Sequence, residues 1–169
     1  PNGKNHLVKT HIPDRLTVQW HITDRCNLRC QHCYQEDYAD NGLRIDDLKK
    51  IARQVFSLQE HWQNAGKRPP LLFTLTGGEP SIHPDFKALI DFLGTHPSNP
   101  SIAVLSNGTQ IDATLAQYFA SRHIAFVQLS IDGTPTTHDT IRGKGNFDQV
   151  LAATHRLSEA GIRVLWSFT

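Results

Sequence analysis

The chain has 169 residues, of which 38% are hydrophobic and 20% are charged, a composition typical of a soluble globular domain and not of a disordered or membrane-spanning chain. This length suits one domain with a substantial core and is too short for two domains of ordinary size. Seventeen Lys and Arg against sixteen Asp and Glu give a net charge of +1, so the charge gives no support for a nucleic-acid or membrane partner.

The cysteines are the most unusual feature of the composition. Cys26, Cys30 and Cys33 lie within eight residues, and an odd, tightly clustered set argues against a disulfide framework. Such a set predicts metal binding in a reducing compartment. The sequence also lacks a long apolar segment, and its first ten residues lack the apolar region of a secretory signal, so we expect a cytoplasmic protein. The absence of methionine indicates a fragment or a processed form.

Short β-rich segments alternate with amphipathic helical segments along the chain. We predict strands over 16–22, 71–76, 101–106, 125–131 and 162–168, helices over 45–62, 83–93, 113–120 (after the cap Asp112) and 147–160, and a turn-rich stretch over 134–146. This alternation predicts an α/β fold of βα units around a parallel sheet. The apolar last strand indicates the N-terminal portion of a larger barrel, with residues 1–15 as a lead-in.

Chemically distinctive residues follow each of the first four predicted strands. The cysteine segment (26–33) follows the first, Gly-Gly-Glu-Pro (77–80) the second, Ser-Asn-Gly (106–108) the third and Ser-Ile-Asp-Gly (130–133) the fourth. In parallel βα folds the chemistry lies at the carboxyl ends of the strands. We therefore expect these segments to form one site.

The cysteine segment supplies three thiolates and no fourth. Iron–sulfur and structural zinc sites usually have four protein ligands, so three thiolates leave one metal position open for an outside ligand. The positive charges of Arg25 and Arg29 are expected to favour the thiolate forms. The alternative is a zinc site with His21 or His32 as the fourth ligand.

The glycine and serine segments offer contacts for a small ligand. Gly77 and Gly78 allow a backbone to approach a ligand closely, and Glu79 adds a carboxylate that can accept from an ammonium group. An ordinary strand-to-helix turn is the alternative. Ser130 and Arg142 offer a hydroxyl and a guanidinium for sugar and carboxylate oxygens, against the alternative of a polar turn with a solvated arginine.

The segment Cys-Asn-Leu-Arg-Cys-Gln-His-Cys-Tyr (26–34) resembles the cluster-binding loop of radical S-adenosylmethionine (radical SAM) enzymes. The resemblance implies that Cys26, Cys30 and Cys33 hold a [4Fe–4S] cluster, whose fourth iron is chelated by the methionine amine and carboxylate of S-adenosylmethionine. In this family the position before the third cysteine is usually aromatic and packs near the adenine. Here that position is His32.

Three further segments resemble the same family, in the same order along the chain. The Gly-Gly-Glu-Pro segment is similar to the family's GGEP motif, which binds the methionine amino group. Ser130 and Arg142 are similar in position to residues that contact the cofactor in the subgroup that modifies peptides and proteins. Asn107 matches a strand-end position of that subgroup.

The resemblance implies a partial TIM-type (βα)6 radical SAM barrel over residues 16–169, truncated after about the fifth strand. It implies reductive cleavage of S-adenosylmethionine to a 5′-deoxyadenosyl radical that abstracts hydrogen from a substrate. The pattern resembles the SPASM/twitch-type subgroup, which implies a peptide or protein substrate and an external flavodoxin- or ferredoxin-like one-electron donor.

An open iron further implies sensitivity to oxygen and an anaerobic setting. The sequence identifies no catalytic acid or base. Two alternatives stay open at this point: a non-catalytic zinc-binding module, and a fragment that binds the cofactor without turning it over.

Overall fold

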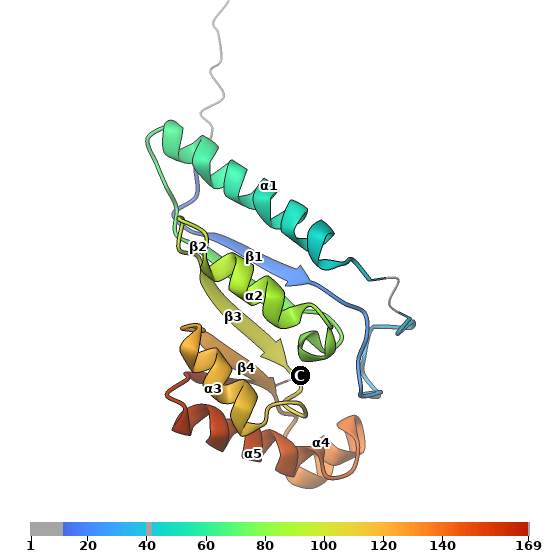
Figure 1. Ribbon diagram of the computed structural model, residues 1–169. Coiled ribbons are helices and arrows are strands. Elements are labelled where there is room, and N and C mark those ends of the chain that lie inside the picture. Colours follow the sequence, from blue (N-terminus) through green and yellow to red (C-terminus); the bar gives the residue numbers. More distant parts are fainter. Residues whose placement is uncertain (1–11, 40–41, 169) are drawn as a thin grey trace, which may run out of the picture.

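The computed structural model describes residues 12–39 and 42–168. In this part of the chain, strands and helices alternate as drawn in Figure 1. The strands are β1 (Leu16–His21), β2 (Leu71–Thr76), β3 (Ser101–Ser106), β4 (Phe126–Ser130) and β5 (Val164–Ser167). The helices are α1 (Ile45–Asn64), the 3-10 helix η1 (Pro80–Ile82), α2 (Phe86–Gly94), α3 (Ala113–Ser121), α4 (Pro135–Arg142) and α5 (Asn146–Glu159). Most of the predicted lead-in, residues 1–11, lies outside the described residues.

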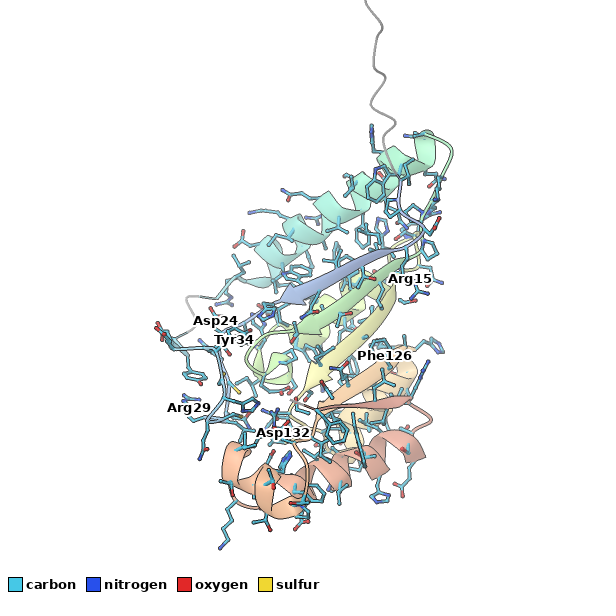
Figure 2. The ribbon with its side chains drawn as sticks, turned by 180° about the vertical axis from the view of Figure 1, so that it is seen from behind. Arg15, Asp24, Arg29, Tyr34, Phe126 and Asp132 are labelled. Carbon is cyan, nitrogen blue, oxygen red and sulfur yellow. The ribbon has the colours of Figure 1, made fainter. Side chains whose placement is uncertain are left out.

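The five strands form one parallel sheet in the order of the sequence, from β1 to β5. Because each strand is added beside the one before it, the sheet winds in one direction, as the wall of a βα barrel does, and does not reverse as a doubly wound sheet does. The opposed views of Figure 1 and Figure 2 show the helices gathered on one face of the sheet. The predicted α/β fold with the architecture of a partial barrel is confirmed.

The main core lies between the sheet and these helices. Phe73 and Leu75 of β2, Leu89 of α2 and Phe119 of α3 are fully buried there. Phe56 of α1 packs edge-on against Phe73, with ring centroids 5.7 Å apart. Truncating a buried phenylalanine to alanine costs about 3–5 kcal/mol, so apolar packing is the main force that holds each helix on the sheet.

Two carboxylates cap helices at the edge of the sheet where the loops meet. As predicted, Asp112 caps α3, and its side chain accepts a hydrogen bond from the N–H of Leu115 at 2.7 Å. The N-cap residue of α1, Arg44, makes no such bond. Instead, the carboxylate of Asp85, just before α2, accepts from the N–H of Ile45 at 3.0 Å. This bond ties the start of α1 to the segment that follows β2.

The prediction of turns throughout residues 134–146 is wrong, because α4 occupies most of that stretch. Thr134 caps the helix by accepting from the N–H of Thr137, and Pro135 lies in its first turn. His138 is the buried residue of this helix, so the segment lacks the apolar stripe by which helices are recognised in a sequence. The helix ends at Gly143, whose φ of +116° suits glycine.

The last strand borders the sheet in the described part of the chain. Trp166 in β5 and the following Phe168 are 47% and 65% exposed. No helix among residues 12–39 and 42–168 combines the length and the apolar character needed to cross a membrane.

Candidate functional site

A cavity of about 360 Å³ opens at the carboxyl ends of the strands. Parallel strands bring these ends to one edge, so the loops after β1, β2, β3 and β4 meet there. The predicted site residues that line the cavity are Cys26, Cys30, His32, Cys33, Gly77, Gly78, Asn107, Ser130 and Arg142. Glu79 lies behind the lining. In Figure 2, Arg29, Tyr34 and Asp132 lie around this end, and Arg15 marks the opposite end of the sheet.

The two glycines after β2 let the cysteine loop lie directly against the strand ends. The N–H of Gly78 donates to the carbonyl of Thr23 at 2.9 Å, and the N–H of Glu79 donates to the carbonyl of Arg25 at 2.7 Å. A Cβ on Gly77 would overlap the carbonyl oxygen of Thr23, and one on Gly78 would overlap that of Arg25. Glycine is therefore required here by the protein's own backbone. Contact of these glycines with a ligand stays a prediction.

The three thiols are free and half-buried around the cavity. Burial raises the pKa of Cys26 and of Cys30, and the positive charge of Arg142 opposes the rise in the pKa of Cys30. Arg29, which the sequence led us to expect as a thiolate partner, donates instead to the carbonyls of Cys26 and Leu28, at 2.7 and 2.8 Å. The cation beside Cys30 thus comes from a position 112 residues away in the chain.

The cysteines do not meet at a single point. Within the described residues, no three or more His, Cys, Asp or Glu side chains are arranged to hold one metal ion. The two candidate histidines have other neighbours, since Nδ1 of His21 lies 3.1 Å from Oη of Tyr34 and Nε2 of His32 lies 3.7 Å from Oδ2 of Asp132. Three thiols spread around one cavity suit a cluster in which each thiolate binds a different iron.

Glu79 is fully buried and ties the end of β3 to the turn after β2. Its carboxylate accepts from the N–H groups of Ser81 and Asn107, at 3.1 and 2.7 Å, and from the hydroxyls of Ser81 and Ser106. Burial raises the pKa of this carboxyl, and the hydrogen bonds partly offset the rise. The contact of Glu79 with an amino group stays a prediction, whereas in the structure its carboxylate binds the backbone of Asn107.

Asn107 connects the end of β3 to the cysteine loop. Its Nδ2 donates to Oδ1 of Asn27 at 3.0 Å and lies 3.8 Å from Sγ of Cys26. Its Oδ1 accepts from the N–H and the hydroxyl of Thr109. Both polar atoms of this amide therefore have protein partners, and Asn107 positions the loop that carries Cys26.

A chain of buried polar groups leads to Cys30. Nε of Arg142 donates to Oδ2 of Asp132 at 2.6 Å, and Nη1 of Arg142 lies 3.9 Å from Sγ of Cys30. Behind this pair, Nδ1 of His138 accepts from the N–H of Asp132 at 3.0 Å, and Nε2 of His138 lies 2.8 Å from Oδ1 of Asn146. His138 is fully buried. It therefore holds the turn that presents the carboxylate of Asp132 to Arg142.

Asp132, His138 and Tyr38 lie at this site although the sequence predicted no role for them. His138 and Arg142 are four residues apart, a spacing that places both on one face of a helix, but that signal required α4 to be recognised first. The guanidinium carbon of Arg29 lies 3.7 Å from the centroid of the Tyr38 ring. No motif marks Tyr38, which follows the last cysteine by five positions. The cavity is also lined by Gln128 of β4.

Comparison with known proteins places these observations in a family. The model of the radical SAM superfamily matches residues 20–169. The chain is 31% identical over 169 residues to Fe-coproporphyrin III synthase of Methanosarcina barkeri, covering 98% of this chain and 39% of that protein. It is 32% identical over 149 residues to the mycofactocin maturase MftC of Mycobacterium tuberculosis, covering 86% of this chain and 35% of that protein.

A solved structure shows the same fold. Native anSMEcpe with bound AdoMet and the Kp18Cys peptide has a TM-score of 0.73 and 22% identity, over 90% of this chain and 42% of that one. The chain thus spans roughly two fifths of the length of these relatives. Because the family model matches all but the first nineteen residues, the chain belongs to the radical SAM superfamily, whose members use a [4Fe–4S] cluster and S-adenosylmethionine.

Proposed function

We propose that Cys26, Cys30 and Cys33 bind the [4Fe–4S] cluster of a radical SAM enzyme, and that S-adenosylmethionine binds in the adjoining cavity. The observation that carries this proposal is the gathering of all three thiols around one cavity at the carboxyl ends of the strands. By this proposal residues 16–169 form the incomplete core of the enzyme, with its first five strands.

The donor set fits such a cluster. Three thiolates can bind three irons and leave the fourth for the amine and carboxylate of the cofactor, and no single-ion site competes for them within the described residues. A cluster held by Cys26, Cys30 and Cys33 would supply one electron for reductive cleavage of S-adenosylmethionine to methionine and a 5′-deoxyadenosyl radical. That electron must come from outside, which supports an external flavodoxin- or ferredoxin-like donor.

The cavity fits a polar ligand of moderate size. Its volume of about 360 Å³ lies in the range of roughly 300–1,000 Å³ found for small-molecule sites. Ser130 offers a hydroxyl, and the backbone of Gly77 and Gly78 borders the same space. His32 supplies a flat ring on the lining of the cavity, and we propose that this ring packs near the adenine. The guanidinium of Arg142 lines the same cavity and, while paired with Asp132 through Nε, offers its remaining N–H groups to a ligand carboxylate.

A peptide or protein is the substrate class that we propose for the whole enzyme. This choice is supported by the resemblance to the peptide-modifying subgroup and by the peptide bound in the anSMEcpe structure, which has the same fold. The relative named for Fe-coproporphyrin III synthesis favours a second candidate, a tetrapyrrole substrate. Mass spectrometry after incubation of the full-length enzyme with a candidate peptide and with a tetrapyrrole separates the two. Under the first candidate only the peptide changes in mass, and under the second only the tetrapyrrole does.

The first experiment is electron paramagnetic resonance (EPR) of the anaerobically reconstituted and reduced protein, with and without S-adenosylmethionine. We expect a [4Fe–4S]⁺ signal that shifts when the cofactor is added and is lost in Cys30→Ala. A cluster signal that does not change when S-adenosylmethionine is added would mean that the cofactor site is incomplete. Binding of zinc without iron or sulfide would overturn the proposal and return the cysteines to a structural role.

A further inference from the structure

Strand β4 presents an amide side chain to the cavity from the face of the sheet that lies opposite the helices. Burial alternates along this strand: Val127 and Leu129 are fully buried in the core beneath the helices, whereas Phe126, Gln128 and Ser130 are half-buried on the other face. Phe126 is labelled in Figure 2. Gln128 and Ser130 both line the cavity. Because two residues of a strand span about 7 Å, Gln128 lies that far from Ser130 toward the interior of the barrel wall.

The amide of Gln128 is free, unlike the other amides of this cavity. Both polar atoms of the Asn107 side chain have protein partners, and Nε2 of Gln35 donates to the carbonyl of Asp24 at 3.2 Å. Within residues 12–39 and 42–168, the side chain of Gln128 makes no hydrogen bond. No buried side-chain nitrogen or oxygen in this part of the chain lacks a partner, so the amide atoms of Gln128 are open to the cavity.

The neighbours of Gln128 on the same face are apolar. In the register of the sheet, Leu105 of β3 lies beside it on one side and Leu165 of β5 on the other. A ligand that hydrogen-bonds to Gln128 therefore does so between two leucines, where water competes less for the bond than it does at the surface.

An amide between two leucines best matches a second amide. The side chain of Gln128 offers N–H donors at Nε2 and a carbonyl acceptor at Oε1. A peptide group offers the complementary carbonyl and N–H, so the two can form a pair of hydrogen bonds. A carboxylate such as the propionate of a tetrapyrrole can only accept, which leaves Oε1 facing a negative charge.

We propose that Gln128 binds a peptide group of the substrate and is a specificity-determining residue of this enzyme. The inference rests on the proposed function, because it takes the cavity to be the site of a radical SAM enzyme. The three cysteines and Arg142 belong to segments beyond the strand ends, whereas Gln128 lies within β4. The cofactor proposed near the former and a substrate at Gln128 thus occupy neighbouring parts of one cavity.

The test compares two small probes that differ only in their N–H groups: N-acetylglycine N-methylamide and its ester counterpart, methyl acetoxyacetate. Saturation-transfer difference NMR gives the dissociation constant of each probe for the full-length protein, anaerobically reconstituted and supplied with S-adenosylmethionine but with no reductant. We expect the wild type to bind the amide probe roughly two- to tenfold more tightly than the ester, the effect of one hydrogen bond of ordinary strength.

In Gln128→Leu this preference should disappear, with the two dissociation constants nearly equal. The leucine fits between Leu105 and Leu165, so the variant keeps an apolar face on the sheet. The concentration of S-adenosylmethionine that half-shifts the EPR signal should be unchanged. The matched control is Gln54→Leu on the exposed face of α1, which should keep the full preference for the amide.

The outcomes separate this inference from the proposed function. A wild-type protein that forms no four-iron cluster overturns both. A wild type that forms the cluster and binds the cofactor, but shows no amide preference or keeps it in Gln128→Leu, overturns the inference alone. Weaker binding of S-adenosylmethionine in Gln128→Leu would assign the amide to the cofactor instead. Preference for sodium propionate over the amide probe, lost in Gln128→Leu, would favour tetrapyrrole carboxylates and also overturn it.

Discussion

Arg142 and Asp132 form a buried ion pair beside the cavity, with Nε 2.6 Å from Oδ2 and side chains that are 9% and 2% exposed. Arg122 and Asp91 form a pair with the same 2.6 Å separation on the outer surface, where the side chains are 43% and 46% exposed. The two pairs share this Nε–Oδ separation and differ in burial. Comparing them therefore shows how burial changes the loss of unfolding free energy when the arginine of an ion pair is removed.

We expect Arg142→Met to lower the free energy of unfolding by about 3–5 kcal/mol, because it removes the guanidinium that pairs with the carboxylate of Asp132 at a site where the side chains are only 9% and 2% exposed. Arg122→Met should cost far less, since water solvates Asp91 when the arginine is removed. Urea unfolding of the metal-free protein measures both. Equal losses in the two variants would mean that Asp132 gains water once Arg142 is gone.

Gly77→Ala and Gly78→Ala should displace the cysteine loop from the strand ends, because each added Cβ overlaps a carbonyl oxygen of the loop. The expected cost is about 1–3 kcal/mol of unfolding free energy, together with a lower iron content after reconstitution. Gly94→Ala at the end of α2 is the control, since a Cβ there meets no atom within 4 Å. Normal iron content in the two loop variants would show that the loop adapts to the added atoms.

The pH dependence of stability should reveal the burial of Glu79. Burial raises the pKa of this carboxyl, so the folded chain holds a proton at pH values at which the unfolded chain has released it. The contribution of Glu79 to the free energy of unfolding is therefore fully present below the ordinary pKa of a glutamate. It is lost as the pH rises through the higher pKa that Glu79 has in the folded chain. In Glu79→Gln this loss is absent.

We therefore expect the unfolding free energy of the wild type, relative to Glu79→Gln, to fall as the pH is raised from about 4 to about 8. Urea titrations at a series of pH values give this difference. Glu159→Gln, on an exposed part of α5, controls for the loss of a surface charge. A difference that grows with pH would mean that the donors from Ser81, Ser106 and Asn107 outweigh the effect of burial.

The cap of α3 should affect stability without affecting the cluster. Asp112→Ala removes the acceptor for the N–H of Leu115 and is expected to cost about 1 kcal/mol. Iron content and the EPR signal after reconstitution should match those of the wild type, because Asp112 does not line the cavity that the cysteines share. A lost cluster in this variant would show that the outer helix and the strand ends are coupled.

Air should remove the cluster from the reconstituted protein. An iron held by no protein thiolate is open to attack, so iron and sulfide content should fall during exposure to air and fall more slowly with S-adenosylmethionine bound. Chemical assays of iron and sulfide over time measure both rates. Full retention in air without the cofactor would contradict an open iron.

Local patterns in the sequence were sufficient for the architecture. The alternation of strand-like and helical segments predicts the parallel sheet, and all five strands appear where their apolar patterns predicted them, with ends that differ by a few residues. The exception is α4, whose buried residue is a histidine and whose surface is polar, so that apolar periodicity gave no signal. For such a segment the cap Thr134 and Pro135 were better evidence than hydrophobicity.

The sequence by itself determined the three-thiol segment and the glycines that follow β2, because each consists of residues that are close together in the chain. It also predicted that the strand ends share one site, because the carboxyl ends of parallel strands lie at one edge of a sheet. Tertiary structure alone decided which donor faces which sulfur. Asn107 and Arg142 are 81 and 112 residues away from the cysteines that they contact. Contacts over such separations depend on how the loops pack against one another, and no local pattern encodes that packing.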